Sequence, residues 1–308
     1  MNRELMRILL PVLSLAILLG AVFYLQPRAM SYFGLNLLFN LAIPVALATM
    51  AQMMILMVND IDLSIGTFVS FCACVTATFV QETPLLGYAI LLAAIAGYAA
   101  IGALIYVRGL PAIVVTLGMS FVWGGLAVMI LPSPGGAPPP WLRTLMTLKP
   151  PLVPLAIIAP IVIALLAHLF VKRSSMGVLL QGVGGNERAL ERAGWSIVRL
   201  RATAYAVAGF FGVLSGMALV GLTTSADANI ALRYTLLSIA GVILGGGEFT
   251  GGRISPIGAV IGALTLTLAA SFLSFLRLSP DWQIGAQGAI LILVLAARLL
   301  VSRREAAA

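Results

Sequence analysis

The sequence predicts an all-α protein, a polytopic bundle of about ten transmembrane helices. Hydrophobic residues make up 61% of the 308 residues, and charged residues only 9%. A soluble globular chain has about 45–50% apolar and about 25% charged residues. One water-soluble core cannot bury such an excess, so lipid must cover the remainder. The hydrophobic stretches follow one another along the whole chain with short gaps, which predicts a single transmembrane domain over residues 1–308.

Charges and Pro/Gly clusters divide the chain into ten hydrophobic segments, near the roughly 20 residues that one span needs. They cover residues 8–26, 35–58, 64–81, 85–106, 110–131, 152–171, 199–222, 232–247, 255–276 and 284–301. The second, fifth and eighth are irregular: Pro44 lies inside the second, and Gly118, Gly124 and Gly125 lie inside the fifth. We expect broken or re-entrant helices in these three, because interrupted backbone survives in a membrane where it lines a protein-walled cavity.

The positive charges predict that both termini lie in the cytoplasm. With the N-terminus inside, thirteen of the 18 Lys and Arg residues fall on the inner side and five on the outer side, as the positive-inside rule requires. An even number of spans then returns the C-terminus to the cytoplasm. This topology explains the net charge of +8. Binding to nucleic acid would be indicated by a basic surface interleaved with aromatic residues, and the sequence contains no such pattern.

Two long connections divide the spans. Residues 132–151 are Pro-rich, and we expect a stiff, extended periplasmic loop there rather than a helix. Residues 172–201 form the longest inner loop and hold six of the inner positive charges. Spans two to five and seven to ten flank this loop as two four-helix units that enter the membrane from opposite sides. Topology alone therefore predicts an inverted repeat, which is common in transporters.

The inner loop carries the signals of one short helix. Asn186 is a favourable N-cap, Glu187 suits the positive end of the helix dipole, and Gly194 is a natural stop. A helix of about two turns is unstable alone in water, so it needs a surface to lie on. Leu190 and Ala193 offer an apolar edge. Two interpretations remain open: a helix that docks on a cytoplasmic partner, and an interfacial helix that only links two spans.

The segments 58–66 (VNDIDLSIG), 109–118 (GLPAIVVTLG), 184–194 (GGNERALERAG) and 245–253 (GGGEFTGGR) share one further property. In this order they resemble the motifs of ribose-type sugar ABC importer permeases. Residues 58–66 (VNDIDLSIG) resemble the family's Gly-Gly-Ile-Asp-Leu-Ser-Val-Gly signature, and residues 109–118 match a further block. Residues 184–194 resemble its coupling loop, and residues 245–253 resemble its Gly-Gly-Thr-Ser-Leu-Phe-Gly-Gly block. The similarity covers nearly the whole chain. Two departures add polarity: Asn59-Asp60 replaces a Gly-Gly pair, and Glu248 stands where a small polar residue is usual.

The resemblance implies a permease subunit of an ATP-driven importer in a bacterial inner membrane, carrying a small hydrophilic solute, a sugar or polyol. Its implied partners are cytoplasmic ATPase subunits, a second permease chain that is identical or different, and a periplasmic solute-binding protein. The chain contains no Gly-x-x-x-x-Gly-Lys-[Ser/Thr] phosphate loop. We therefore expect no cofactor on this chain, with ATP and magnesium on the partner subunit.

The candidate site residues form two groups. The expected ATPase-coupling residues are Gly185, Asn186, Glu187, Arg188, Leu190, Ala193 and Gly194. The expected pathway-shaping residues are Asn59, Asp60, Asp62, Ser64, Gly66, Pro111, Thr116, Gly246, Gly247 and Glu248. A charge at mid-bilayer costs about 2.5–3.5 kcal/mol, so the presence of Asp60 and Asp62 at the end of a span needs an explanation. Either their segment shapes the pathway, with Asp62 and Ser64 capping the third span, or they simply cap that span at the inner interface.

Two other functions compete with the importer. An ion-coupled secondary transporter needs intramembrane carboxylates or unwound carbonyls near the midplane, whereas the acidic residues here fall at predicted span ends. A non-transporting membrane scaffold is the third hypothesis. The sequence holds no metal-ligand cluster, nucleophile elbow or paired catalytic acids, so we expect neither a metal site nor an enzyme.

Overall fold

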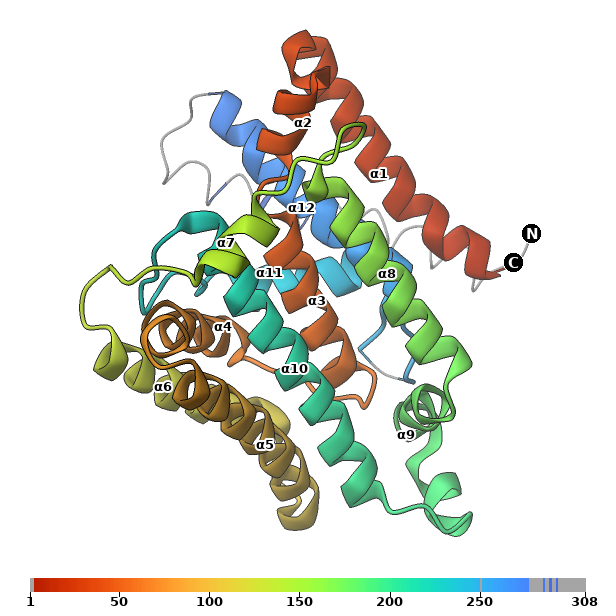
Figure 1. Ribbon diagram of the computed structural model, residues 1–308. Helices are drawn as coiled ribbons and strands as arrows, with labels where there is room; N and C mark the ends of the chain where they lie inside the picture. The colour runs from red at the N-terminus through yellow and green to blue at the C-terminus, as the bar shows by residue number, and fades with distance from the viewer. Residues whose placement is uncertain (1–2, 250, 277–284, 286–287, 290–291, 293–308) are drawn as a thin grey trace.

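The structure is a computed structural model that describes residues 3–249, 251–276, 285, 288–289 and 292. Over these residues the chain is helical, and the predicted all-α class is confirmed (Figure 1). The α-helices are α1 (Arg3–Leu25), α2 (Tyr32–Leu38), α3 (Ala42–Leu56), α4 (Ile65–Val75), α5 (Pro84–Arg108), α6 (Ala112–Ile130), α7 (Pro140–Met146), α8 (Leu155–Arg173), α9 (Ser175–Arg192), α10 (Ile197–Thr223), α11 (Tyr234–Leu244) and α12 (Pro256–Phe275). A 3-10 turn covers Pro27–Met30, and a π-helical stretch, Thr76–Val80, prolongs α4.

Six helical segments of the described chain are long and apolar enough to cross a membrane. They are Tyr32–Leu56, Pro84–Arg108, Ala112–Ile130, Leu155–Arg173, Ile197–Thr223 and Pro256–Ser274. The predicted first, third and eighth spans correspond to shorter apolar helices, Pro11–Leu25, Ile65–Val80 and Tyr234–Leu244. The predicted tenth span, 284–301, lies outside the described residues except at four positions. The chain is therefore a polytopic helical membrane protein.

The predicted interruptions are found in two of the three irregular segments. The second is divided into α2 and α3 at residues 39–41, and Pro44 lies in the first turn of α3, where proline is tolerated. The eighth is reduced to α11, whose 11 residues extend about 16 Å and cannot alone cross a core of about 30 Å. The expected break in the fifth is wrong. α6 runs without interruption from Ala112 to Ile130 through its three glycines.

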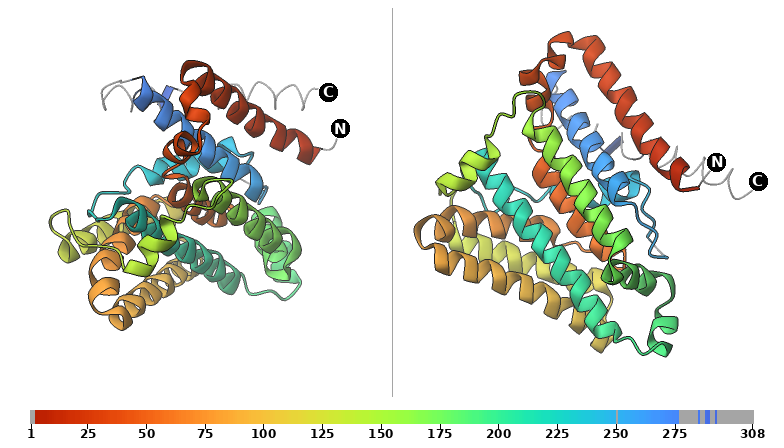
Figure 2. Two further views of the ribbon diagram at one scale, coloured as in Figure 1. Left: turned by 45° about the horizontal axis from the view of Figure 1, so that its top comes forward. Right: turned by 45° about the vertical axis from the view of Figure 1, so that its right-hand side comes forward.

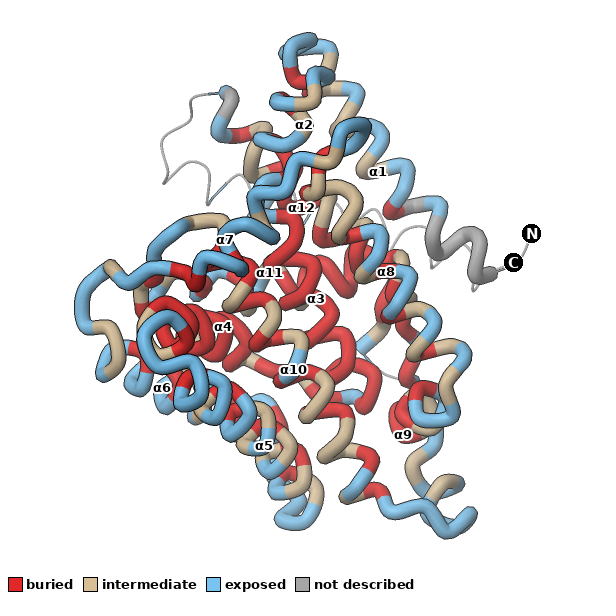
Figure 3. The backbone as a smooth tube through the Cα atoms, in the orientation of Figure 1, coloured by how far each residue is buried: buried red, intermediate tan, exposed pale blue. Residues whose placement is uncertain are grey.

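α3 and α10 form the centre of the bundle. Every residue of α3 is buried, as its red trace in Figure 3 shows. α10 packs against both α3 and α5, while α11 and α12 cover another side of α3. α4 lies between α10 and α6, and α1 lies along α12 (Figure 2). α5 and α6 turn rows of exposed leucine, valine and isoleucine outward, as expected of lipid-facing surface.

Both long connections contain more helix than predicted. The Pro-rich segment includes α7, because Pro140 stands at the first helical position, where its fixed φ favours a helix. Residues 172–201 are not an open loop: α8 continues to Arg173, and α9 begins at once with Ser174 as its N-cap. The first part of α9 buries Gly177, Leu180 and Val183. That helical period is hard to recognise in a segment so rich in glycine.

Candidate functional site

The chain between α3 and α4 returns into the bundle as a non-helical segment, residues 57–64, here called the re-entrant segment. The turn is made at Asn59, whose φ of +63° is left-handed, a conformation that asparagine tolerates better than most residues. The segment then reaches Tyr98, which donates to the Asp62 carboxylate at 2.8 Å. Tyr98 lies ten residues before the end of α5, about 15 Å along the helix. α4 therefore starts deep inside the bundle.

Asp62 is the fully buried centre of this segment. Its Oδ1 accepts from the Ser64 N–H at 2.6 Å and from the Ser64 hydroxyl at 2.7 Å. The Gln52 amide, with its nitrogen toward the Asp62 carbonyl, pairs with both backbone groups of Asp62 at 3.0 and 3.2 Å. Every strong acceptor of this carboxylate is thus engaged, as burial of a charge requires.

The structure corrects one expectation about Ser64 and refines one about Asp62. Ser64 occupies the N-cap position of α4 but makes no side-chain cap; its hydroxyl bonds Asp62 and Tyr98 instead. Asp62 lies just before α4, as expected, but this end of α4 is buried beside Tyr98, ten residues before the end of α5. The hydropathy pattern could not show this, because it cannot distinguish a chain that turns back from one that leaves the membrane.

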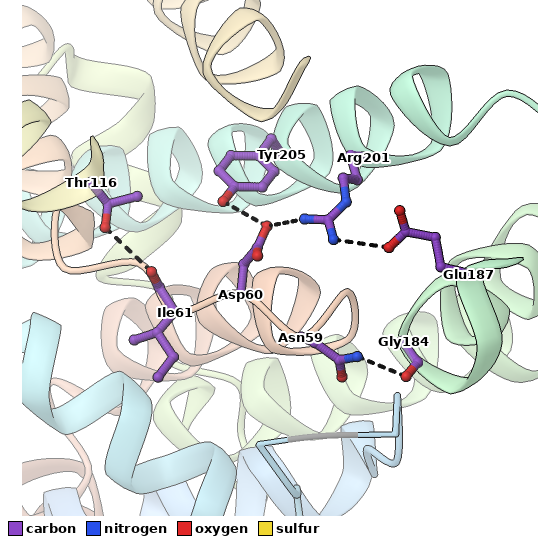
Figure 4. Close-up of polar contacts among 8 residues, drawn as sticks. All are labelled: Asn59, Asp60, Ile61, Thr116, Gly184, Glu187, Arg201 and Tyr205. Carbon is purple, nitrogen blue, oxygen red and sulfur yellow. Dashed lines mark hydrogen bonds and ion pairs between the residues drawn. The ribbon is translucent and has the colours of Figure 1, made fainter. Parts of the chain in front are cut away.

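Thr116 and Gly66 hold the re-entrant segment on its other sides. The Thr116 hydroxyl accepts from the Leu63 N–H at 3.1 Å. It donates to the Ile61 carbonyl at 3.3 Å, as Figure 4 shows. Gly66 donates its N–H to Thr235 at 3.0 Å, and its α-carbon lies too close to the loop before α11 for any side chain. Pro111 is exposed at the N-terminal boundary of α6, so it positions Thr116 only through that helix.

The short helix predicted in the inner loop is present as residues 187–192, here called the loop helix. α9 is kinked at Asn186, whose φ of −157° is non-helical, and the Asn186 side chain accepts from the Ala189 N–H at 3.1 Å. At the other end Gly194 has a φ of +86°, and the Trp195 N–H bonds the Leu190 carbonyl at 3.0 Å. This is a Schellman C-cap. Both predicted helix boundaries are confirmed.

The loop helix turns most of its surface to solvent. Leu190 is half-buried against Gly182, which lies in α9 before the kink. Glu187 is also half-buried. The other expected coupling positions are exposed, as is Trp195: Gly185, Asn186, Arg188, Ala193 and Gly194. Most of this charged and apolar surface has no cover in the described chain.

Polar contacts connect the loop helix with the re-entrant segment (Figure 4). The Asn59 amide donates to the Gly184 carbonyl at 2.8 Å. Arg201 of α10 bonds the Asp60 carboxylate through Nη1 at 2.7 Å and the Glu187 carboxylate through Nη2 at 3.1 Å. The Tyr205 hydroxyl also donates to Asp60, at 3.1 Å. The expected coupling residues and the expected pathway-shaping residues therefore meet around Arg201.

Arg201 is the site residue that sequence reasoning missed. It was counted only as one of the inner positive charges, yet its side chain is 13% exposed and contacts both groups. It also stands over the Tyr106 ring of α5, 5.6 Å from the centroid, and the Tyr106 hydroxyl donates to Glu191 of the loop helix at 2.7 Å. A signal was available: Tyr205 follows Arg201 by one helical turn, so the two share a face.

The glycine-rich turn before α12 reaches the same region from another side. Gly246 is left-handed with a φ of +94°, and Gly247 lies tightly against Val242. Glu248 pairs with Arg253 across the turn at 3.6 Å. Gly252 abuts α9, so that Gly184 is enclosed by Gly252 and Met57. This turn therefore supports α9. Among the described residues, no group of three or more His, Cys, Asp or Glu side chains could hold a metal ion.

Sequence comparisons with known proteins identify the family of this chain. The sequence model of the family described as "Branched-chain amino acid transport system / permease component" matches residues 34–295. The probable ABC transporter permease protein y4mJ of Sinorhizobium fredii is 29% identical over 304 residues, covering 95% of this chain and 90% of that protein. The ribose import permease protein RbsC of Escherichia coli K12 is 26% identical over 299 residues, covering 92% and 90%.

A shorter similarity connects the chain with a second sugar permease. The galactose/methyl galactoside import permease protein MglC of Haemophilus influenzae is 32% identical over 133 residues, which are 43% of this chain and 40% of that protein. No solved structure matches the chain. The family match spans most of the sequence, and the chain belongs to the family of ABC transporter permease components.

Proposed function

We propose that this permease forms half of a permease pair that imports a small hydrophilic solute, a sugar or a polyol, across a bacterial inner membrane. Relatives that match most of the chain include a ribose import permease, and a shorter match is a galactose/methyl galactoside import permease. The proposal extends their solute class to this chain. A periplasmic solute-binding protein delivers the solute, and cytoplasmic ATPase subunits supply the energy.

One observation carries the proposal: the loop helix is capped at both ends, is largely exposed, and is bonded to the re-entrant segment. An exposed helix of six residues gains little stability from its own hydrogen bonds. Its caps fix its ends instead, which suits a surface that must transmit a displacement as a rigid body. The ATPase subunit docks on the exposed side of residues 185–194. ATP and magnesium belong to that subunit, and this chain binds no cofactor.

The finer topology is part of the proposal. Ten spans with both termini in the cytoplasm place α9 inside, the Pro-rich loop 132–151 in the periplasm, and residues 172–201 as the cytoplasmic coupling region of one transmembrane domain. The packing supports an inverted repeat that exchanges α3 with α10, α4 with α11 and α5 with α12. α10 contacts α5 and α4, and α3 correspondingly contacts α12 and α11. α4 and α11 are both 11-residue helices that follow a non-helical segment.

The re-entrant segment shapes the solute pathway in this proposal, together with the turn at residues 246–248. Interrupted helices whose ends meet near the midplane are typical of transporter binding sites. Asp60 and Asp62 shape the segment rather than grip the solute in this proposal. Both oxygens of Asp62 are engaged by Ser64 and Tyr98, and Oδ2 of Asp60 is engaged by Arg201 and Tyr205.

The test separates docking from folding. Arg188→Glu and Arg192→Glu reverse exposed charges of the loop helix, and Gly185→Pro disturbs its entry. We expect each variant to insert normally but to lose ATPase co-purification and uptake of labelled D-ribose, D-galactose or myo-inositol. The matched control is Arg143→Glu, a reversal in the last turn of α7, which should keep both.

Energy coupling is tested on the wild-type complex. Uptake should stop with vanadate and persist with an ionophore. The reverse result would favour the secondary transporter, and co-purification of an ATPase without solute-stimulated hydrolysis would favour the scaffold.

A further inference from the structure

We propose that Arg201 is the positioning residue that couples the loop helix to the re-entrant segment, through the Asp60–Arg201–Glu187 bridge. The inference rests on the proposed function, because it concerns how movement imposed by a docked ATPase reaches the pathway. Glu187 was expected among the coupling residues, but its carboxylate is turned toward Arg201 and is not part of the exposed side on which the ATPase docks. Neutralising this carboxylate should therefore leave docking itself intact.

The bridge joins three elements through one side chain. Nη1 of Arg201 bonds Asp60 of the re-entrant segment, and Nη2 bonds Glu187 in the first turn of the loop helix. The guanidinium is planar and offers its donors in a fixed fork, so it sets the separation of the two carboxylates. Without Arg201 these two negative groups would repel each other. The cation therefore makes the position of one carboxylate depend on the position of the other.

The surroundings restrict how Arg201 can move. Its side chain is only 13% exposed and is covered by the Tyr106 ring. Tyr205, one turn further along α10, holds Asp60 from the other side at 3.1 Å. Tyr106 also donates to Glu191, which attaches the second turn of the loop helix to α5. A displacement of the loop helix must carry Arg201 and Asp60 along with it, or break charge-assisted hydrogen bonds in a poorly solvated place.

The residues on the segment side are those that depart from the family signature. Where the ribose-type motif has Gly-Gly, this chain has Asn59 and Asp60, and both side chains reach toward the inner loop, to Gly184 and Arg201. Glycine at these positions would offer neither contact. The bridge is thus built by the two departures together with Arg201, and it gives this permease a direct ionic connection between its coupling element and its pathway segment.

The experiment measures how accessible the re-entrant segment is to a thiol reagent. Ile61→Cys introduces a thiol on this segment, and the native Cys72 and Cys74 are buried, which keeps their own reaction slow. The complete complex is reconstituted, and the rate of maleimide labelling at position 61 is compared with and without ATP plus vanadate. The inference predicts a rate change with the native bridge. It predicts no change with Arg201→Gln or Glu187→Gln, although the ATPase subunit still co-purifies and hydrolyses ATP.

Transport efficiency gives the second measurement. Solute imported per ATP hydrolysed should fall by roughly 5- to 150-fold, the usual range for coupling between two sites, in both Arg201→Gln and Glu187→Gln. Glu187→Gln removes only the half-exposed side of the bridge, so it answers the question even if Arg201→Gln fails to fold. Arg201→Lys keeps the positive charge but loses the forked pair of guanidinium donors. It should restore only part of the solute-to-ATP ratio. The control Arg199→Gln, an exposed residue of the same helix, should behave as wild type.

The outcomes separate the two proposals. If the wild-type chain recruits an ATPase, and Glu187→Gln keeps both the nucleotide-dependent labelling change and the solute-to-ATP ratio, the coupling role of Arg201 is wrong and the importer stands. If the wild-type chain recruits no ATPase, the importer proposal itself fails.

Discussion

The side-chain amide of Asn59 donates a hydrogen bond to the carbonyl oxygen of Gly184, 2.8 Å away, although 125 residues separate them in the chain. Asn59 forms the turn of the re-entrant segment, and Gly184 lies just before the kink that starts the loop helix. The bond joins two segments that lie far apart in the sequence and carry separate groups of candidate site residues. It also defines a region where small changes in volume should have large effects.

Gly184→Ala should destabilise the protein, because a Cβ at this position would collide with the Met57 carbonyl and approach the Gly252 α-carbon to 2.7 Å. Backbone atoms cannot move aside as a flexible side chain can, so we expect a loss of about 1–3 kcal/mol, the usual cost of overpacking. The measurement is the midpoint of thermal unfolding in detergent. Gly118→Ala is the matched control, since its Cβ would meet open space; equal midpoints for the two variants would contradict the packing described here.

Tyr98→Phe should also lower stability, because it removes the donor to the Asp62 Oδ2 at 2.8 Å. Leaving a buried acceptor unsatisfied costs about 1–3 kcal/mol, and more for a charged group. The ring remains, so its contacts with Phe68 at 4.3 Å and Trp123 at 6.1 Å are kept. Unfolding monitored by tryptophan fluorescence checks this. The control is Tyr24→Phe at an 87% exposed position, and a shift no larger than that control would show that Asp62 does not depend on Tyr98.

Gly194→Ala and Gly194→Asn should differ in how strongly the protein binds the ATPase subunit. The φ of +86° is left-handed, which penalises alanine by about 1 kcal/mol or more, whereas asparagine adopts such angles more readily. We expect the alanine variant to fray the C-terminal end of the loop helix and to bind the ATPase subunit more weakly. Pull-down of the ATPase at matched expression measures the difference. Identical binding by both variants would mean that the cap is not needed for docking.

The sequence predicted the helical class, most spans and both caps of the loop helix, because each depends on local pattern: hydrophobic runs, charge placement, and the preferences of Asn186 and Gly194. It did not predict what depends on contacts distant in the chain. The burial of Asp62 beside Tyr98 was not predicted, because hydropathy cannot show the chain turning back into the bundle. Arg201 was read as a topogenic charge because its two carboxylate partners come from elements 14 and 141 residues away.

The helices α7 and the first part of α9 were missed for a different reason. Proline at 138–140 and glycine at 182, 184 and 185 are poor helix formers, yet each is placed where the helix tolerates it. Pro140 opens a helix, and Gly184 lies where the backbone of Met57 leaves no room for a side chain. Packing thus requires residues that propensity alone would count against a helix.

The most direct test of the account is the sidedness of the loop helix. Ala189→Cys places a thiol at an exposed position of that helix, and Leu152→Cys places one at an 89% exposed position in the connection before α8, expected in the periplasm. A membrane-impermeant maleimide added to intact cells should label position 152 and leave position 189 unlabelled until the inner membrane is opened. Labelling of position 189 in intact cells would place the loop helix on the wrong side for any ATPase and would contradict the account.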